Sequence, residues 1–187
     1  MSSGIPEVIP IEHGPLPMRT YHRAPSGKLL QRVEDYYPTT DDNVWMELAL
    51  DLAEEAGENG DNAVGSVLVA PGDRVFGTQT REFRDGNLLG HAEILAYNLA
   101  QPEIGRDLRQ CRLYCSAEPC HQCAGLYDVG RIGMLFVATK KVEAPKFFRK
   151  PNTLNHIWKT TRRELIVVEG LKRARGVVIL EKYAKKH

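Results

Sequence analysis

Apolar residues recur along the chain first at helical spacing and then at strand spacing. From Trp45 to Ala53 they follow a helical period, behind polar residues at 41–43 that can cap a helix. Two β-rich stretches, 63–70 and 74–80, are separated by a Pro-Gly-Asp turn, which predicts a hairpin. The compact part of the chain is therefore expected to begin near residue 41 with a helix and a hairpin.

Helical and strand patterns then alternate toward the end of the chain. Alternation of this kind favours a mixed sheet covered by helices on both faces. The prediction is an α/β fold with three layers, α/β/α, around a mixed five-stranded sheet. The further elements expected are a helix at 91–101, a strand at 111–117, a helix at 120–130, strands at 134–139 and 164–169, and a basic helix at about 171–185.

Residues 1–40 are rich in proline and show little periodicity, so we expect an N-terminal arm, with residues 41–187 forming the folded domain. The 187 residues are about the size of one domain. Lys and Arg total 25 against 24 Asp and Glu, so no overall positive field indicates a nucleic-acid or membrane partner. Because no signal sequence or membrane-length apolar stretch is evident, a soluble, cytoplasmic protein is expected.

Four cysteines, Cys111, Cys115, Cys120 and Cys123, lie within thirteen positions. A disulfide scaffold would spread its bridges through a small secreted chain, so a reduced compartment and metal or thiol chemistry fit better. Cys111 and Cys115 fall on one face of the predicted strand and are expected to be small buried residues. The C-x-x-C motif alone is compatible with a redox pair, half of a zinc ribbon or chance.

A thiol pair alone does not explain the second motif, GHAEILA. Catalytic zinc sites take three protein ligands and leave a fourth position to water, and His91, Cys120 and Cys123 supply that number. Cysteines three apart at a helix start lie on one face, where the positive helix terminus favours thiolates. If His91 also begins a helix, both helix starts can meet at the same end of neighbouring elements.

Glu93 follows His91 by two residues, so it can approach the metal only if His91 lies at an irregular first turn, which Gly90 permits. Its carboxylate would accept a proton from the activated water, pass it to a ring nitrogen and help to protonate the departing amine. His121 lies between the two cysteines, but adjacent helical residues face different ways. We therefore expect His121 to contact solvent or another subunit.

The motif H-A-E followed by P-C-x-x-C resembles the signature of the zinc-dependent cytidine deaminase-like superfamily. The resemblance extends from about Trp45 to Leu180, through AVGSVLV, GHAEILA, SAEPCHQC and ELIVVEGL. It implies the cytidine deaminase-like fold and a hydrolase that deaminates a nucleobase-like ring. It also implies one zinc ion per chain, held by His91, Cys120 and Cys123, with Glu93 as the catalytic residue.

Within the superfamily, AEPCHQC resembles the branch of guanine deaminases and tRNA adenosine deaminases, which implies a purine-type, guanine-like substrate. Members of that branch carry an asparagine eleven residues before the metal-binding histidine, where this chain has Thr80. A threonine hydroxyl cannot present the paired donor and acceptor of an amide, so the base contact is altered or supplied elsewhere. The resemblance also assigns substrate contacts to backbone groups of Ala92, Ala117 and Glu118, although Glu118 is equally expected as a structural acceptor.

Asn62, His156 and Trp158 are further candidates for the substrate pocket. Asn62 precedes the first predicted strand, where an asparagine is also typical of a turn. The stretch KFFRKPNTLNHIW, at 146–158, lies where relatives have a loop that covers the substrate. Its Phe148, His156 and Trp158 either stack on the heterocycle or anchor the loop by packing.

Deamination of a small aminated nucleobase or nucleoside-like heterocycle, with release of ammonia, is the leading hypothesis. A tRNA adenosine-to-inosine deaminase is an alternative, because Lys and Arg gather at 171–187 and could contact phosphates. A non-catalytic, zinc-stabilised binding subunit is another, although Glu93 argues against it. A redox protein would leave His91 and Glu93 without a role. By resemblance the chain is also expected to form a homodimer, with no membrane partner.

Overall fold

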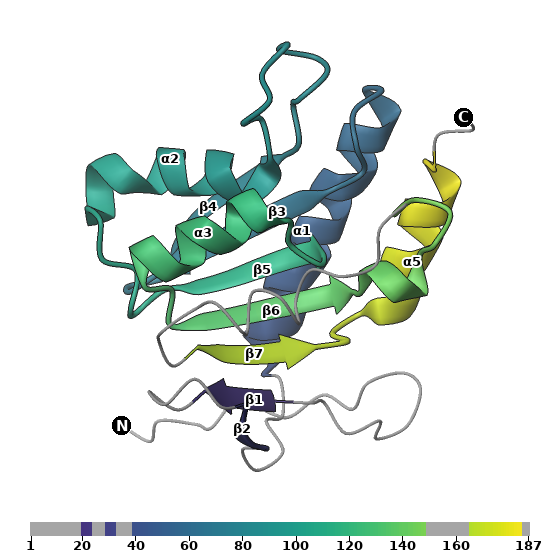
Figure 1. Ribbon diagram of the computed structural model, residues 1–187. Helices are drawn as coiled ribbons and strands as arrows, with labels where there is room; N and C mark the ends of the chain where they lie inside the picture. Colours follow the sequence, from purple (N-terminus) through teal and green to yellow (C-terminus); the bar gives the residue numbers. More distant parts are fainter. Residues whose placement is uncertain (1–19, 24–28, 33–38, 149–164, 185–187) are drawn as a thin grey trace.

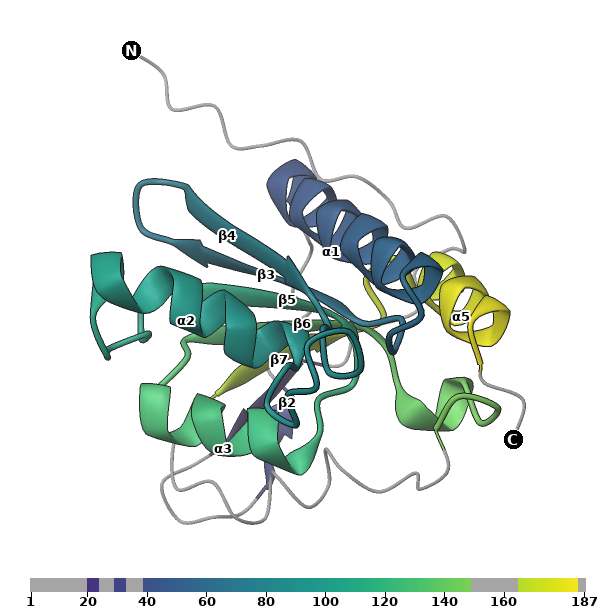
Figure 2. The same ribbon diagram turned by 90° about the horizontal axis from the view of Figure 1, so that it is seen from above.

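Helices cover both faces of a mixed sheet in the computed structural model, which describes residues 20–23, 29–32, 39–148 and 165–184 (Figure 1). The helices are α1 (Thr40–Glu58), α2 (Ala92–Ile104), α3 (His121–Gly130) and α5 (Arg173–Lys182), with a 3-10 turn, η1, at Lys141–Glu143. The strands are β1 (Thr20–Arg23), β2 (Leu29–Arg32), β3 (Gly65–Ala70), β4 (Arg74–Gln79), β5 (Arg112–Ala117), β6 (Met134–Thr139) and β7 (Ile166–Glu169). Seen from above, α1 and α5 lie on one side of the sheet and α2 and α3 on the other (Figure 2). The three-layer α/β/α prediction is confirmed.

Each of the five predicted strands is present, and the helices differ from the prediction only at their ends. The first helix is capped by Thr39, one turn earlier than predicted. The Thr39 backbone N–H donates to Asp42 Oδ2 at 2.8 Å and the Asp42 N–H donates to Thr39 Oγ1 at 3.2 Å, which together form a capping box. Within the described residues, no helix is both long and apolar enough to cross a membrane.

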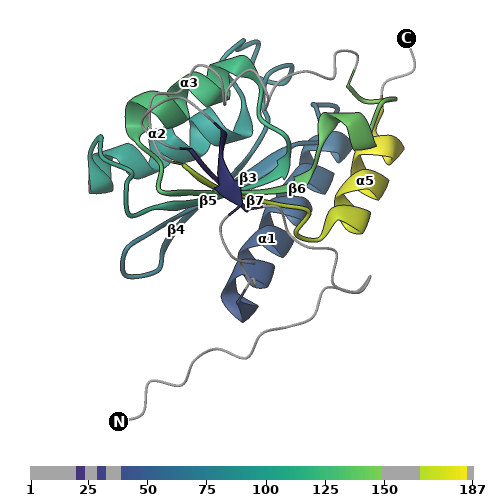
Figure 3. The same ribbon diagram turned by 60° about the horizontal axis from the view of Figure 1, so that its bottom comes forward.

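Two short strands from the N-terminal segment extend the sheet beyond β7. In the part of the chain that the structure describes, the strand order is β2-β1-β7-β6-β5-β3-β4, so the sheet has seven strands rather than the expected five. Thr20 and Tyr21 of β1 pair antiparallel with Val168 and Val167. The purple N-terminal strands come forward in Figure 3, on the β7 side of the sheet. This pairing covers the backbone edge that β7 would otherwise expose. The division into an arm at 1–40 and a domain at 41–187 stays a prediction.

The core is divided by the sheet, because alternate residues of each strand face opposite sides. On β5, Leu113 and Cys115 face the cluster beneath α2 and α3, whereas Tyr114 faces the cluster beneath α1 and α5. Tyr114 stacks on Phe136 of β6 with ring centroids 4.5 Å apart. Cys111 and Cys115 are both buried in the first cluster, as the even spacing predicted.

Strand direction brings several connections to one edge of the sheet. Strand β3 is antiparallel to both β4 and β5, so β4 and β5 run the same way, and β6 and β7 are parallel to β5. The carboxyl ends of β4, β5 and β6 therefore lie beside the start of β3. These strand ends together form the shared edge of the sheet, which is distinct from the outer strands. Ligand sites in α/β sheets lie at the carboxyl ends of parallel strands.

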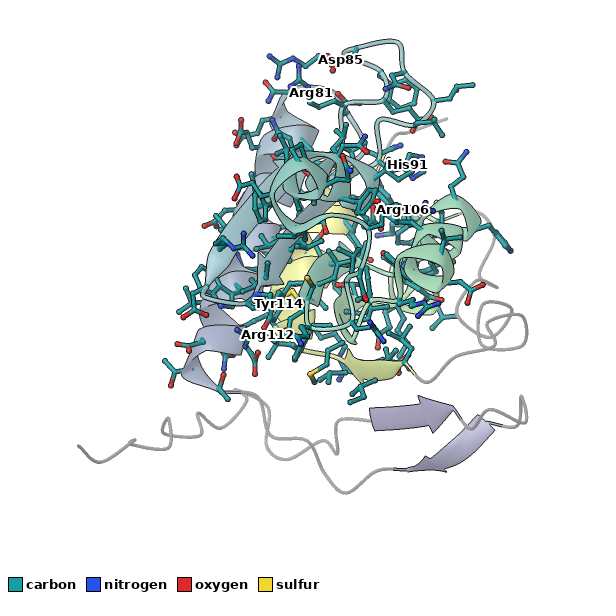
Figure 4. All side chains as sticks on the ribbon, turned by 90° about the vertical axis from the view of Figure 1, so that its left-hand side faces the viewer. Arg81, Asp85, His91, Arg106, Arg112 and Tyr114 are labelled. Carbon is teal, nitrogen blue, oxygen red and sulfur yellow. The ribbon has the colours of Figure 1, made fainter. Side chains whose placement is uncertain are left out.

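A buried carboxyl group links α1 to β5 by hydrogen bonds, away from the carboxyl ends of the strands. Asp42 is fully buried, and its Oδ1 accepts hydrogen bonds from the Tyr114 hydroxyl at 2.5 Å and from Arg112 Nη1 at 3.3 Å. Figure 4 shows Tyr114 and Arg112 near each other, well below His91 in that view.

Replacing Tyr114 with Phe should destabilise the fold, because it removes a donor from a buried carboxylate. We expect a loss of about 1.5–3 kcal/mol in the free energy of unfolding, measured by urea denaturation of the zinc-loaded protein. Tyr97→Phe is the matched control, since the Tyr97 hydroxyl forms no hydrogen bond within the described residues. Equal losses in the two variants would contradict this role for Asp42.

Candidate active site and metal centre

Three side chains with zinc-binding chemistry meet at the shared edge of the sheet. His91 Nδ1 lies 3.2 Å from Cys120 Sγ and 3.5 Å from Cys123 Sγ, and the two sulfur atoms are 3.5 Å apart. A tetrahedral zinc with ordinary bond lengths holds a nitrogen and a sulfur about 3.5 Å apart and two sulfurs about 3.8 Å apart. Both the donor set and its spacing therefore fit one zinc ion.

The three ligands come from the starts of two helices. His91 is the N-cap of α2, with extended backbone at φ −75° and ψ 140°, and Cys120 is the N-cap of α3, at φ −84° and ψ 177°. Cys123 follows in the first turn of α3. The positive ends of both helices favour thiolate ligands. The meeting of two helix starts that the motifs predicted is thus observed, with Pro119 one position before the N-cap rather than inside the helix.

The loop that delivers His91 is held by its own backbone. The Arg81 N–H donates to the Gly90 carbonyl at 2.8 Å, and buried Asp61 accepts from the Phe83 N–H at 2.7 Å. A Cβ on Gly90 would lie 2.9 Å from backbone atoms on the other side of the loop, so a larger residue does not fit. Gly90 therefore acts through close packing of the loop rather than through an unusual turn.

The thiols and the imidazole are electrostatically coupled. The hydrogen bond shared with Cys123 lowers the pKa of the Cys120 thiol to about 3 and raises the pKa of Cys123. The same cluster raises the pKa of His91, chiefly through its hydrogen bond with Cys120. The hydrogen bonds in the cluster thus favour the thiolate form of Cys120, which is the form that binds metals.

Glu93 lies beside this cluster in the first turn of α2. Its side chain is buried, and burial raises the pKa of its carboxyl group above the ordinary range for a glutamate. A raised pKa brings a carboxyl group closer to the range in which it can both accept and donate a proton.

A cavity of about 260 Å³ opens beside the metal ligands. Six of the residues predicted for the site line it: Asn62, Thr80, His91, Glu93, Glu118 and Cys120. Cys123 is buried behind them, and Ala92 and Ala117 do not line the cavity. His156 and Trp158 lie outside the described residues. Phe148 does line the cavity, together with Phe147.

The backbone around the cavity is already hydrogen-bonded in places where substrate contacts were predicted. The Glu118 N–H donates to the Thr139 carbonyl at 2.8 Å, and the Ala92 carbonyl accepts from Thr78 Oγ1 at 2.5 Å. The Glu118 carboxylate accepts the Lys141 N–H at 2.7 Å, which supports the structural role that the sequence also allowed. Substrate contacts of Ala92 and Ala117 stay predictions.

Sequence reasoning missed Val64, Glu82, Lys141 and Phe147 as cavity residues. Glu82 is the most informative of them, because its Oε2 lies 3.9 Å from Nε2 of His91 and accepts from Asn62 Nδ2 at 3.2 Å. This carboxylate lies on the Nε2 side of the imidazole, opposite the Nδ1 atom that the two sulfur atoms contact. Asn62 therefore lines the cavity and holds Glu82, while its carbonyl also accepts the Val64 N–H at 2.7 Å in a turn.

The sequence as a whole agrees with this geometry. Residues 39–139 match the family model of the cytidine and deoxycytidylate deaminase zinc-binding region. The chain belongs to this family. Its deaminase relatives indicate a zinc-dependent hydrolytic deaminase, and His91, Cys120 and Cys123 are the residues that could hold the zinc ion.

Relatives within the deaminase family differ in substrate. The chain is 36% identical over 121 residues to a tRNA-specific adenosine deaminase of Agrobacterium fabrum, which covers 60% of this chain and 78% of the relative. It is 32% identical over 84 residues to a probable cytosine deaminase of Schizosaccharomyces pombe, covering 45% of this chain and 51% of the relative.

Solved structures show the same divergence. A structure from a study of A-to-I editing by tRNA:A34 deaminases matches with a TM-score of 0.60 and 29% identity, covering 73% of this chain and 98% of that one. Guanine deaminase from Nitrosomonas europaea matches with a TM-score of 0.64 and 23% identity, covering 76% and 84%, which establishes the shared fold.

The zinc content should depend on the three ligands and should not depend on His121. We expect about one zinc ion per chain in the purified deaminase, and loss of most of it in His91→Ala, measured by mass spectrometry of the metal. His121→Ala is the matched control, since His121 is exposed and lies outside the ligand cluster. Zinc loss in His121→Ala with retention in His91→Ala would reverse the ligand assignment.

Proposed function

We propose that this deaminase hydrolyses the amine of a small, purine-type heterocycle, guanine-like, and releases ammonia with Glu93 as the proton carrier. The observation that carries the proposal is the buried Glu93 carboxyl, which lines the same cavity as His91 and Cys120. The cavity is smaller than the roughly 300–1,000 Å³ of pockets that hold drug-sized ligands. The volume favours a free heterocycle, such as a fused purine ring, over a larger nucleotide.

The proposed proton path uses one carboxylate twice. His91, Cys120 and Cys123 would hold the zinc ion, which would make a water molecule acidic enough to become the nucleophile. Glu93 accepts a proton from that water and delivers it to the adjacent ring nitrogen as the C–O bond forms. Glu93 then relays the second proton to the leaving amine, the C–N bond breaks, and ammonia and an oxo product remain.

A tRNA adenosine deaminase is the second candidate, favoured by the name of the Agrobacterium relative. Against it, the described cations of the basic C-terminal stretch are occupied in ion pairs within the chain. Lys172 lies 3.0 Å from Glu47, Arg173 3.1 Å from Glu143, Arg175 2.5 Å from Asp51 and Lys182 2.8 Å from Glu54. Neutralised cations attract phosphates weakly.

The remaining alternatives have less support. A non-catalytic subunit would not need a buried carboxyl beside the ligands, and a redox pair would not need His91. The homodimer that the resemblance implies stays a prediction.

Glu93→Ala should separate catalysis from metal binding. We expect it to keep its zinc and to lose about 10²- to 10⁴-fold in the rate of ammonia release, because no other group takes over the proton transfers. The rate is measured across guanine, adenine, cytosine, their nucleosides, pterins and triazines. Glu103→Ala, an exposed carboxylate on the same helix, is the control and should behave like the wild type. Normal turnover by Glu93→Ala would refute the mechanism.

Binding of tRNA separates the two substrate classes. A protein that neutralises six to ten phosphates loses about 10³- to 10⁵-fold in affinity between 50 and 200 mM salt. We expect the zinc-loaded deaminase to release ammonia from a free heterocycle and to bind tRNA weakly at both salt concentrations in a filter assay. Tight, steeply salt-dependent binding, with deamination of tRNA alone, would favour the second candidate.

A further inference from the structure

Lys141 places a nearly buried cation at the cavity, outside the zinc and proton-transfer machinery. It is separated from β6 by Lys140, begins η1 and lines the cavity, and only 7% of the residue is exposed. The Lys141 N–H is held by the Glu118 carboxylate at 2.7 Å, and its ammonium lies 5.6 Å from the centre of the Phe148 ring. The backbone and an aromatic face thus fix where this cation stands.

Lys140, the preceding residue, has a structural role that can be compared with the position of Lys141. Lys140 Nζ forms an ion pair with Glu169 at 2.7 Å, which accounts for its position. Within the described residues, the Lys141 ammonium forms no salt bridge. Burial lowers the pKa of Lys141, with the Glu118 and Glu93 carboxylates acting in the opposite direction. Burying a donor group costs free energy unless the group is hydrogen-bonded to an acceptor. A substrate bound in the cavity could supply that acceptor to Lys141.

The charges around the cavity limit the kind of acceptor. Three carboxylates, Glu82, Glu93 and Glu118, line the same space as Lys141. A phosphate or carboxylate on the substrate would be repelled by them, since like charges in a partly desolvated site are unfavourable. A neutral oxygen accepts from the ammonium without adding negative charge. The oxo oxygen of a heterocycle is such a group.

Thr80 offers the cavity a single hydroxyl group. Thr80 is 4% exposed and lines the cavity, but its single hydroxyl cannot replace the donor and acceptor pair of an amide. Lys141 enters the same cavity from the end of β6, whereas Thr80 enters it from the end of β4. A cationic donor makes a stronger hydrogen bond than a neutral amide does.

We propose that Lys141 is a specificity-determining residue that donates a hydrogen bond to a ring oxo oxygen of the substrate. The inference rests on the proposed function and narrows it: the deaminase selects aminated heterocycles that carry an oxo group, as guanine and cytosine do, over those that lack one, as adenine does. The Phe148 ring holds the ammonium in place by a cation–π contact.

Two matched substrate pairs test the assignment. Guanine and 2-aminopurine differ in one oxo group, and so do cytosine and 4-aminopyrimidine. We expect Lys141→Met to lower kcat/KM for the oxo-bearing member of the pair that the wild type accepts by about 10- to 100-fold, as for the loss of a charged hydrogen bond. The value for the oxo-free member should stay within about threefold, as is usual for a group that a ligand does not touch.

Control variants separate specificity from folding. Lys146→Met removes an exposed lysine from the same segment and should leave kcat/KM unchanged for both substrates of the pair. Zinc content is measured in every variant, so that a loss of metal is not mistaken for a loss of recognition. Lys141→Arg, which keeps a cationic donor, should recover part of the preference for the oxo-bearing member.

The outcomes distinguish this inference from the proposed function. Deamination of oxo-free rings in preference to oxo-bearing ones, or equal losses on both members in Lys141→Met, would overturn the role of Lys141 while leaving the deaminase reaction intact. If no heterocycle releases ammonia, the proposed function fails. Calorimetric binding of the same pairs to the zinc-loaded wild type and Lys141→Met then decides the assignment: an oxo-dependent loss of affinity supports it, and an equal or absent loss refutes it.

Discussion

The antiparallel pairing of β3 with both of its neighbours is the constraint on which the site depends. Because β4 and β5 then run in the same direction, the connections that leave them begin at one edge of the sheet. His91 and Cys120 are the N-caps of the helices at the ends of those connections, and this arrangement brings their ligand atoms to 3.2 Å. Gly65 allows α1 to pack closely on β3, since a Cβ there would lie 2.1 Å from the Ala49 carbonyl of α1.

The same edge concentrates charge, and the site tolerates this because each charge has a defined neighbour. Glu82 accepts from Asn62 and lies 3.9 Å from Nε2 of His91, on the side of the ring opposite the nitrogen that the sulfur atoms contact. Glu93 is buried, which raises its pKa and suits it to carry a proton. Two thiolates and an imidazole would leave a bound zinc ion with no net formal charge, so the metal would offset the negative charge of both thiolates.

The sequence predicted the parts of the fold that repeat and the parts of the site that lie inside motifs. The helix starts at His91 and Cys120 follow from spacing, and the burial of Cys111 and Cys115 follows from strand alternation. Strands β1 and β2 were missed because four-residue strands amid prolines show no period, and their pairing is decided by the free edge of β7. Glu82 and Lys141 were missed because neither lies within a recognised motif: loop packing against Asp61 and the turn of η1 bring them to the cavity.

In the proposed function, the reaction and the substrate selectivity therefore reside on different elements at one edge of the sheet. The ligands and Glu93 belong to the first turns of α2 and α3, where helix geometry fixes them, whereas Thr80, Asn62 and Lys141 lie at strand ends and in turns. Strand ends tolerate substitution better than helix N-caps that must hold a metal, so substrate preference can change without loss of the reaction. One contact links the two groups: the Glu118 carboxylate, two residues before Cys120, binds the backbone N–H of Lys141 at 2.7 Å. A shift of the β6 connection that moved the cation would thus also strain the start of α3, so that selectivity at Lys141 is coupled to the placement of the metal ligands.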